Sequence, residues 1–497
     1  MTAQTSGAQA GRACLLITLV FASGACSVAP AYRHPALATP AAWQNAPPST
    51  AAADVPGAGA AGGSVPETSA AALWPAADWW RSFGSAQLDD YIARAQAGND
   101  DIAAAVARVR EADAQARIAG AALLPSLELG ATASRQRQRL ISGSPPVTYD
   151  DYAPQLTASY ELDFWGRNRA ARDAARFAAE ASRYDRETVA LTVVTSVALT
   201  YFEVLEQHDR LAVARDNLAN AQHVLDGLTL EQSVGVATAL DVAQQATTVA
   251  TLNASIPPLA QQLQQNIDAL AILVGQMPES IDAGEASLAQ LTPPPITAGL
   301  PSALLARRPD VAEAEAQLMA ANADIGVARA AYFPSIDLTA SGGFASTALS
   351  TVLLPQSRVF ALTAALSQSI FDPGARRGQL EYSHARYAEL LSGYHKTVLT
   401  ALGNVEDALV AVQQTSEQEL RQQQAVDTAR RAFQYSQLQM QAGTTNVLTV
   451  LNTETALFTA QDTWVQVKYQ RLQALVDLYR ALGGGWRQSR VAQGTAE

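Results

Sequence analysis

The sequence has little cysteine and little charge, and each shortage excludes a class of structure or partner. It contains two cysteines, Cys14 and Cys26, and Cys14 lies inside an apolar N-terminal segment that reads as an export signal. A chain cut before Cys26 has no second cysteine with which to form an internal disulfide. Charged residues make up 16% of the chain and the formal net charge is −12, whereas nucleic-acid-binding domains carry basic patches. We therefore expect no nucleic-acid partner.

The sequence also shows no clear signature of a membrane-spanning helix or of an enzyme site. Hydrophobic residues form 48% of the chain, but no uninterrupted apolar run approaches the roughly 20 residues of a spanning helix. The five histidines include no HExxH-like pair. Phosphate-binding glycine loops are absent as well, because the glycine run 483–485 reads as the end of a helix. We expect no enzyme activity, no metal and no cofactor.

The sequence contains an internal duplication. The motif around Pro125 returns around Pro334, an offset of 209 residues that Asp101 and Asp310 share. Gly235 pairs with Gly443, and Gly275 with Gly483, at an offset of 208. This period is far longer than the about 20–50 residues of solenoid repeats. It predicts two pseudo-equivalent halves packed side by side, over residues 73–290 and 291–486, followed by a flexible tail at 487–497.

The N-terminus carries an export signal. Arg12 precedes an apolar stretch of signal-peptide length at residues 13–22. Residues 23–26 (SGAC) then resemble the lipobox of bacterial lipoproteins, although Ser23 stands where Leu is usual. This resemblance implies that residues 1–25 are removed, that Cys26 carries the lipid anchor, and that Ser27 directs the protein to the outer membrane. An ordinary signal peptide is the alternative. Residues 26–72, rich in Ala, Pro, Gly and Ser, predict a tether that does not fold alone.

Two segments in each half alternate between apolar and small polar residues, which predicts β-strands at about 125–140, 152–163, 334–345 and 357–371. Tilted strands of about 9–11 residues cross a bilayer. A half-buried soluble sheet has the same alternation, but the export signal and the lipobox favour the membrane. We expect the following side chains to face lipid: Leu156, Tyr160, Leu162, Phe360, Leu362 and Leu366.

Four strands cannot close a barrel, and an open sheet edge in lipid leaves unpaired backbone groups that cost several kcal/mol each. Other copies of the chain must therefore complete it. Two copies would give eight strands with a filled interior, whereas three would give twelve with an open lumen. The strand count leaves both possibilities open, and a conduit requires the larger one.

Long helical hairpins follow each strand pair, at about 167–274 and 378–482. No proline occurs between Arg167 and about Leu230, so the first helix could reach on the order of 90 Å at about 1.5 Å per residue. Its partner is expected to break at Pro257-Pro258, where a new helical segment would open. The apolar faces of such hairpins have no packing partner within one chain. This favours a helical barrel, in which hairpins of several chains pack against one another.

Several motifs together resemble the outer-membrane efflux proteins, the TolC-like factors, and in particular their NodT-type lipoprotein branch. They are residues 79–84 (WWRSFG), 124–127 (LPSL), 307–311 (RRPDV), 332–335 (YFPS), 443–448 (GTTNVL) and 479–486 (YRALGGGW). The resemblance implies an α+β membrane protein with four transmembrane β-strands and long α-helical hairpins per chain. Three chains would assemble a twelve-stranded barrel and a periplasmic helical barrel.

The resemblance also implies a function. The homotrimer would sit in outer-membrane lipid of a Gram-negative bacterium and dock on a periplasmic adaptor and an inner-membrane resistance-nodulation-division pump. It would export small molecules such as drugs. Two alternatives stay open, namely the duct of a type I protein secretion system and a coiled-coil surface protein that transports nothing. The turn motifs and the paired strands count against the second.

By the same resemblance, the hairpin turns form the tips that meet the adaptor. These residues are Val234, Gly235, Val236 and Ala237 in the first half and Ala442, Gly443 and Thr444 in the second. The constriction of the tunnel in several relatives uses carboxylates near the tips. Here the positions before Gly443 carry mainly amides, so we expect closure by side-chain packing and amide hydrogen bonds, with Gln434, Gln437 and Gln441 as candidates.

Overall fold

The computed structural model describes residues 28–37, 39–45, 74–139, 143, 145–281, 284, 286–294 and 301–486. The signal peptide, Cys26, most of the 26–72 tether and the 487–497 tail lie outside these residues. The main elements, in chain order, are α3 (Ala86–Gly98), α4 (Asp100–Ala121), β1 (Ser126–Gln138), β2 (Val147–Glu161), α5 (Arg167–Ser233), α6 (Ala239–Val274), α7 (Pro301–Leu304), α8 (Pro309–Ala330), β3 (Ser335–Phe344), β4 (Arg358–Ser367), α9 (Ala375–Gln441) and α10 (Val447–Ala481).

The described residues fall into two compact units, and each unit draws on both sequence repeats. The first lies within Met1–Ala36, Arg108–Arg183 and Glu313–His395, and the second within Leu37–Ala107, Tyr184–Ala312 and Lys396–Glu497. The boundaries of these units do not coincide with those of the expected repeats at 73–290 and 291–486. The long helices α5 and α9 explain this, because each begins in the first unit and ends in the second.

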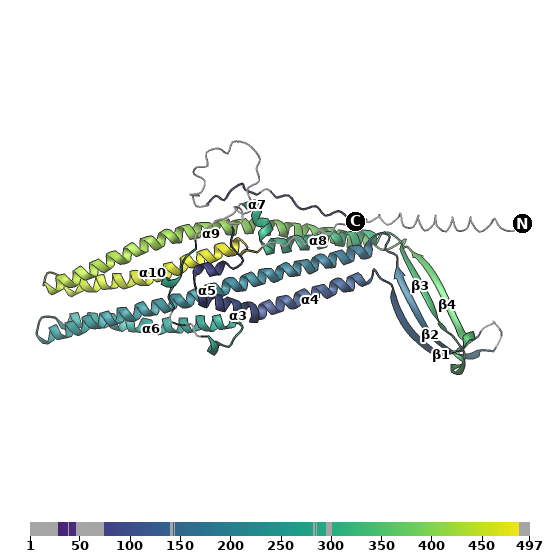
Figure 1. Cartoon of the computed structure of the whole chain (residues 1–497), viewed down its shortest axis with the longest axis horizontal. Helices are drawn as coiled ribbons and strands as arrows, with labels where there is room; N and C mark the ends of the chain where they lie inside the picture. Colours follow the sequence, from purple (N-terminus) through teal and green to yellow (C-terminus); the bar gives the residue numbers. More distant parts are fainter. Residues whose placement is uncertain are drawn as a thin grey trace, which may run out of the picture. The chain divides into compact units, whose positions relative to one another are not determined.

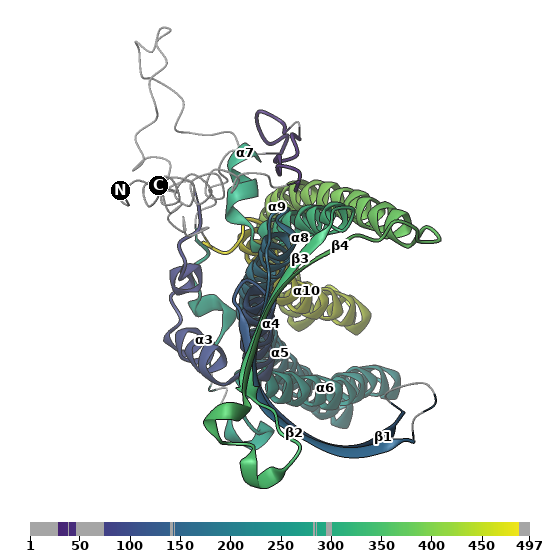
Figure 2. The same ribbon diagram turned by 90° about the vertical axis from the view of Figure 1, so that its right-hand side faces the viewer.

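The first unit contains a four-stranded antiparallel sheet in the order β1-β2-β3-β4, which is strongly curved (Figures 1 and 2). Leu129 lies opposite Leu156, Leu156 opposite Gly342, and Gly342 opposite Phe360. Since directly opposed residues share a face and side chains alternate along a strand, this register places the predicted apolar positions of all four strands on one face.

The strand boundaries differ from the expected ones where the alternation of apolar residues stops. β2 begins at Val147 rather than near 152, because its polar first residues pair with the distal end of β1, as in Gln136 opposite Tyr149. β4 ends at Ser367 rather than near 371, and Ile370 and Phe371 follow it as exposed residues outside the sheet. Periodicity therefore located the apolar part of each strand, missed the polar start of β2 and placed the end of β4 too late.

The second unit contains two helical hairpins, α5 with α6 and α9 with α10 (Figure 1). The side chain of Gln245 on α6 donates to the carbonyl of Ala221 on α5 at 2.8 Å. Gln422 on α9 likewise donates to the carbonyl of Ala460 on α10 at 3.0 Å. An amide side chain thus bonds across each hairpin, which satisfies its hydrogen-bonding groups where it is buried or half-buried.

The expected helix break at Pro257-Pro258 is wrong, because α6 runs continuously through both prolines. A proline removes the hydrogen bond to the carbonyl four residues earlier. Both prolines lie on the exposed side of the helix, so water reaches the carbonyls that they leave unpaired. The helix is held in place on its other face by packing.

One helix among the described residues, α5, contains an 18-residue window apolar enough to span a membrane by length and composition. Half of that window is buried inside the protein. Burial of this kind is typical of a core helix, so composition alone does not make α5 a membrane segment.

Candidate functional site

The apolar face of the sheet is open to its surroundings in the single chain. Phe360 is 85% exposed, Leu362 79% and Leu366 70%. Leu156 is 44% exposed, while Tyr160 and Leu162 are partly buried. An isolated soluble sheet would hide such residues, since burying one large apolar side chain is worth about 1.5–3 kcal/mol. All six positions expected to face lipid are thus accessible or partly accessible.

The opposite face of the sheet is polar. Glu128 lies opposite Thr157, Thr157 opposite Ser341, and Thr339 opposite Thr363. The sheet is therefore amphipathic across its thickness, with small polar side chains on one side and an apolar band on the other. This division is typical of a transmembrane barrel that holds water inside.

Aromatic side chains gather where the strands meet the helices. The ring of Trp165 stacks on Phe333 with centroids 4.7 Å apart, and its indole N–H donates to the carbonyl of Pro334 at 2.8 Å. The guanidinium of Arg376 lies 5.8 Å from the centre of the Tyr332 ring. Rings with one apolar side and one hydrogen-bonding end suit the boundary between lipid and water.

A short segment after the predicted anchor, residues 28–34, forms a strap along the helices of the first unit. Its first residue, Val28, donates to the carbonyl of Trp165 at 3.5 Å. The side chain of Asn322 on α8 donates to the carbonyl of Pro30 at 2.9 Å. Glu315, also on α8, contacts two further side chains of the strap. The strap therefore begins beside the aromatic junction at the base of the strands.

The turn between α5 and α6 holds the first set of expected tip residues. Gly235 has φ +82°, a left-handed conformation that side chains with a Cβ rarely adopt. Thr238 and Asp241 then bond reciprocally at the start of α6, which forms a capping box. Val234 and Val236 are 70% and 73% exposed, although a turn has no structural need for two exposed valines.

The turn between α9 and α10 repeats this arrangement. Gly443 has φ +70°, and the side chain of Asn446 accepts from the backbone of Thr449 to cap α10. Thr444 donates through both its backbone and its hydroxyl to the carbonyl of Gln439. The two turns are thus built alike at equivalent repeat positions, and a Cβ at either glycine would meet nothing within 4 Å.

The candidate constriction residues lie on α9 in the two turns of helix before Gly443. Gln434 and Gln441 are exposed, whereas Gln437 is half-buried. Tyr435 and Leu438, beside them, are 63% and 60% exposed. This stretch of α9 is accordingly a largely uncovered surface of mixed amides and apolar groups.

A buried carboxyl between the two hairpins was not anticipated. Glu454 on α10 is 0% exposed, and neither of its oxygens has a hydrogen-bond partner among the residues that the structure describes. Burial raises the pKa of Glu454 to about 7. The side chain of Gln245 on α6 lies beside it, is itself fully buried, and its Oε1 also has no partner. A protonated Glu454 could donate to that oxygen. In the sequence Glu454 looks like an ordinary solvated position, so no signal identified it.

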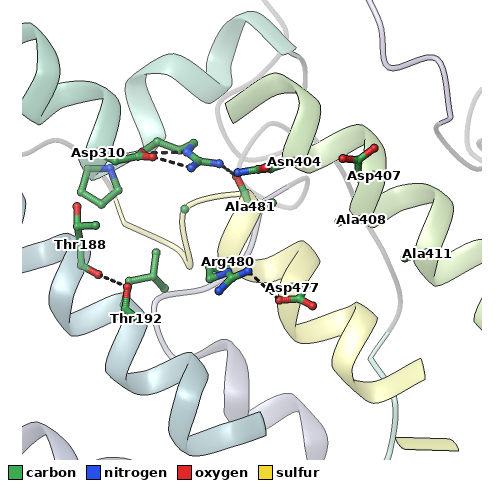
Figure 3. A pocket seen from close by; sticks show the side chains of 14 residues that line it. Thr188, Thr192, Asp310, Asn404, Asp407, Ala408, Ala411, Asp477, Arg480 and Ala481 are labelled. Carbon is green, nitrogen blue, oxygen red and sulfur yellow. Dashed lines mark hydrogen bonds and ion pairs between the residues drawn. The ribbon is translucent and has the colours of Figure 1, made fainter. Parts of the chain in front are cut away.

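The Arg308-Pro309-Asp310 motif lines a cavity of about 460 Å³ in the second unit (Figure 3). The guanidinium of Arg308 makes two bonds to Asp310, at 2.9 and 2.6 Å, and a third to the carbonyl of Ala481 at 3.0 Å. Ala481 is the last residue of α10, and Pro309 opens α8. The motif therefore ties two helix ends together. Within the part of the chain that the structure describes, no group of three His, Cys, Asp or Glu side chains could hold a metal ion.

Comparisons with known proteins agree with this geometry. The model of the outer membrane efflux protein family matches residues 91–276 and 300–484. The chain is 41% identical over 489 residues to the pyoverdine export outer membrane protein OpmQ of Pseudomonas aeruginosa, covering 96% of each. It is 33% identical over 479 residues to the toluene efflux pump outer membrane protein TtgF of Pseudomonas putida, covering 95% of this chain and 96% of that one.

The fold is similar to a solved structure as well. The outer-membrane channel OprN superposes with a TM-score of 0.83 at 25% sequence identity, over 93% of this chain and all of that one. The residues that the family model matches include the strands, both hairpins and the turn motifs described above. The chain belongs to the outer membrane efflux protein family, and it is an efflux channel protein of the outer membrane that extends into the periplasm.

Proposed function

We propose that three copies of this chain form the outer-membrane duct of a tripartite efflux system. The observation that carries this proposal is the unfinished sheet. β1 and β4 are the two outer strands of the sheet, so each has one side on which the described residues place no strand. In lipid such edges must be paired. Three sheets of four strands close a twelve-stranded barrel, whose interior is wide enough for a solute to pass.

A closed barrel in lipid also determines what each face of the sheet contacts. The face that carries Phe360, Leu362 and Leu366 would contact lipid, and the face that carries Thr157, Thr339 and Thr363 would line the water-filled interior. A contiguous band of large exposed apolar side chains is more stable against an apolar medium than against water. Small hydroxyl side chains leave the lumen both open and wet.

Small organic molecules are the substrate class that we favour over secreted proteins. The relatives are named for the export of two different molecules, pyoverdine and toluene. A generic duct explains such a range, because selectivity then resides in the partner that loads the duct. We place that partner in the inner membrane, as a pump of the resistance-nodulation-division class.

The two hairpin turns are the proposed contacts with a periplasmic adaptor. Val234, Gly235, Val236 and Ala237 would form one kind of tip, and Ala442, Gly443 and Thr444 the other. Exposed valines on a rigid, capped turn provide an apolar contact without a large cost in ordering. Gln434, Gln437 and Gln441, just before the second tip, would close the resting tunnel through amide hydrogen bonds between protomers.

Cys26 is the proposed lipid anchor, and the strap supports it. Val28 is bonded to Trp165 at the aromatic junction, and two residues of chain span at most about 7 Å. An acyl chain on Cys26 would therefore start at the level of the membrane boundary. Each buried CH₂ contributes about 0.8 kcal/mol, and two or more chains anchor stably. An unmodified Cys26 thiol in a mass spectrum of the mature protein would refute the anchor.

The function can be tested by cross-linking in cells that express the protein with its adaptor and pump. A photoreactive amino acid at Val236 should form a covalent adduct with the adaptor, and the cells should expel a fluorescent pump substrate. The same amino acid at Leu349, which is 68% exposed beyond β3, is the matched control and should give no adduct. Equal adducts from both positions, or export that persists without this protein, would contradict the proposal.

A further inference from the structure

The apolar face of the sheet ends in arginines. On β1 the face that begins with Leu127 and Leu129 continues to Arg135 and Arg137, because side chains two residues apart point the same way. Arg139 follows at the same spacing. These residues lie at the end of the sheet farthest from its helical junctions, next to the loop that joins β1 to β2 (Figure 1). The basic residues thus extend the band that would face lipid.

The outer strand at the other edge has the same arrangement. Arg358 is the first residue of β4 and lies opposite Phe344. Its face is shared with Phe360, Leu362 and Leu366, which lie two, four and eight residues further along the strand. One face of β4 therefore also runs from leucine near the helices to arginine at the distal end.

Arg135 and Arg358 each lie the same distance along their strand from the helical end of that strand. Arg135 is eight residues beyond Leu127, and Arg358 is eight residues from Leu366. These two leucines are the first residues of the apolar face at the helical ends of β1 and β4. Eight residues at about 3.4 Å span roughly 27 Å. A tilt of about 40° leaves about 21 Å along the membrane normal, close to the roughly 25 Å height of a barrel's apolar band. Both arginines would thus lie at its outer edge.

Most of this positive charge is not compensated within the chain. Arg135 has one ion-pair partner, Asp150, at 3.4 Å. Residue 148, opposite Arg137, is an uncharged threonine, and Asp151 is on the other face of β2. Among the residues that the structure describes, no carboxylate forms an ion pair with Arg137, Arg139 or Arg358, and all three are exposed. The group therefore carries a net positive charge.

Closure of the barrel brings the two sets together. β1 and β4 are the open edges of the sheet, so β4 of one protomer would lie beside β1 of the next, and Arg358 would join Arg135, Arg137 and Arg139 at the seam. We propose that this seam binds the phosphate groups of the phosphorylated glycolipid of the outer leaflet. Guanidinium groups bind phosphate through paired N–H donors, and their aliphatic stems can lie along the apolar band. The inference rests on the trimeric duct proposed above.

The test uses the purified, full-length trimer in detergent and a bis-phosphorylated glycolipid of the lipid A type as the probe. Native mass spectrometry should detect bound glycolipid on the wild-type trimer. The double variant Arg137→Gln with Arg358→Gln should bind at least tenfold more weakly, whereas the Lys double variant at the same positions should retain most of the binding. Arg421→Gln, which alters an exposed arginine of α9, is the control and should bind as the wild type does.

Two further measurements identify the ligand group. The dephosphorylated glycolipid should bind at least tenfold more weakly, because it lacks the groups that the guanidiniums bind. Millimolar inorganic phosphate should not displace the intact glycolipid, because the apolar band also holds its acyl chains. Equal binding by the wild type and the Gln double variant, or equal binding of both glycolipids, would overturn the inference. Trimer mass and substrate export of the Gln variant are measured in parallel. If both are normal while glycolipid binding is unchanged, the lipid site is refuted and the duct is not.

Discussion

At the scale of single residues, we expect the same substitution to have different effects at neighbouring positions of β4, because their side chains lie on opposite faces of the sheet. Leu362→Arg places a charge on the proposed lipid face and should destabilise the assembled barrel by roughly 2–4 kcal/mol at mid-bilayer depth. Thr363→Arg places the same charge in the lumen and should chiefly change conductance. Thermal unfolding and single-channel conductance of the two variants separate these effects.

Cysteine labelling provides a check on the same register. A cysteine at position 363 should react in intact membranes with a water-soluble maleimide small enough to enter the lumen, while one at position 362 should be protected by lipid. Labelling at 362 without labelling at 363 would show that the faces are assigned the wrong way round.

Glu454 makes the stability of the hairpins depend on pH. Its folded-state pKa of about 7 lies above the ordinary value of 4.5, so the folded protein binds this proton more tightly than the unfolded chain does. Stability should therefore fall as pH rises from about 4.5 through 7, and the full loss is roughly 3 kcal/mol. Glu454→Gln removes this loss, because a neutral amide can donate to Gln245 at every pH.

The measurement is the thermal midpoint at pH 5 and pH 8. Glu454→Gln should raise the midpoint at pH 8 and have little effect at pH 5. Glu417→Gln, at an exposed position on α9, is the matched control and should alter neither midpoint by a comparable amount. The same pH dependence in the Glu454→Gln variant and the wild type would show that this carboxyl is not the titrating group.

At the scale of elements, substitutions in the hairpin turns can distinguish the effect of a distorted turn from the effect of a blocked adaptor contact. Because Gly235 and Gly443 have positive φ, a large residue at either position strains the turn as well as adding bulk. Val236→Trp adds bulk at an exposed position without occupying the left-handed glycine. We expect it to reduce efflux severalfold by blocking the adaptor while the protein still assembles and reaches the outer membrane.

Val236→Ala is the control for that experiment and should leave efflux within about twofold of the wild type, since it removes one small contact. Drug-susceptibility assays and the oligomeric mass of each variant are the readouts. Normal resistance in a strain that carries Val236→Trp together with Thr444→Trp would show that these turns are not the docking surface.

Much of the element order was visible in the sequence because its signals are local. Pro125 and Pro334 precede β1 and β3, and Gly235 and Gly443 mark the two hairpin turns. Strand pairing beyond the apolar segment was not visible, because the polar start of β2 has no alternation. The continuity of α6 was also missed, since solvent access to the carbonyls before Pro257 and Pro258 is a property of the fold.

At the scale of the whole molecule, the duplication explains why each of the two compact units contains parts of both sequence repeats. Each repeat supplies a strand pair and a helix to the first unit and a hairpin to the second. Neither repeat can complete a sheet or a helical layer alone. The sites that the sequence did not suggest, Glu454 beside Gln245 and the arginines at the sheet edge, depend on contacts between elements, which no local pattern encodes.

The trimer is the central claim, because the lumen, the lipid-facing band and the arginine seam all require it. The most direct measurement is the mass of the purified mature protein by native mass spectrometry in detergent. A trimer gives a particle of three times the mass of the mature chain, and this mass should be retained when the detergent is exchanged. A particle of one or two chains would contradict it, because four strands cannot close a barrel and eight leave no open lumen.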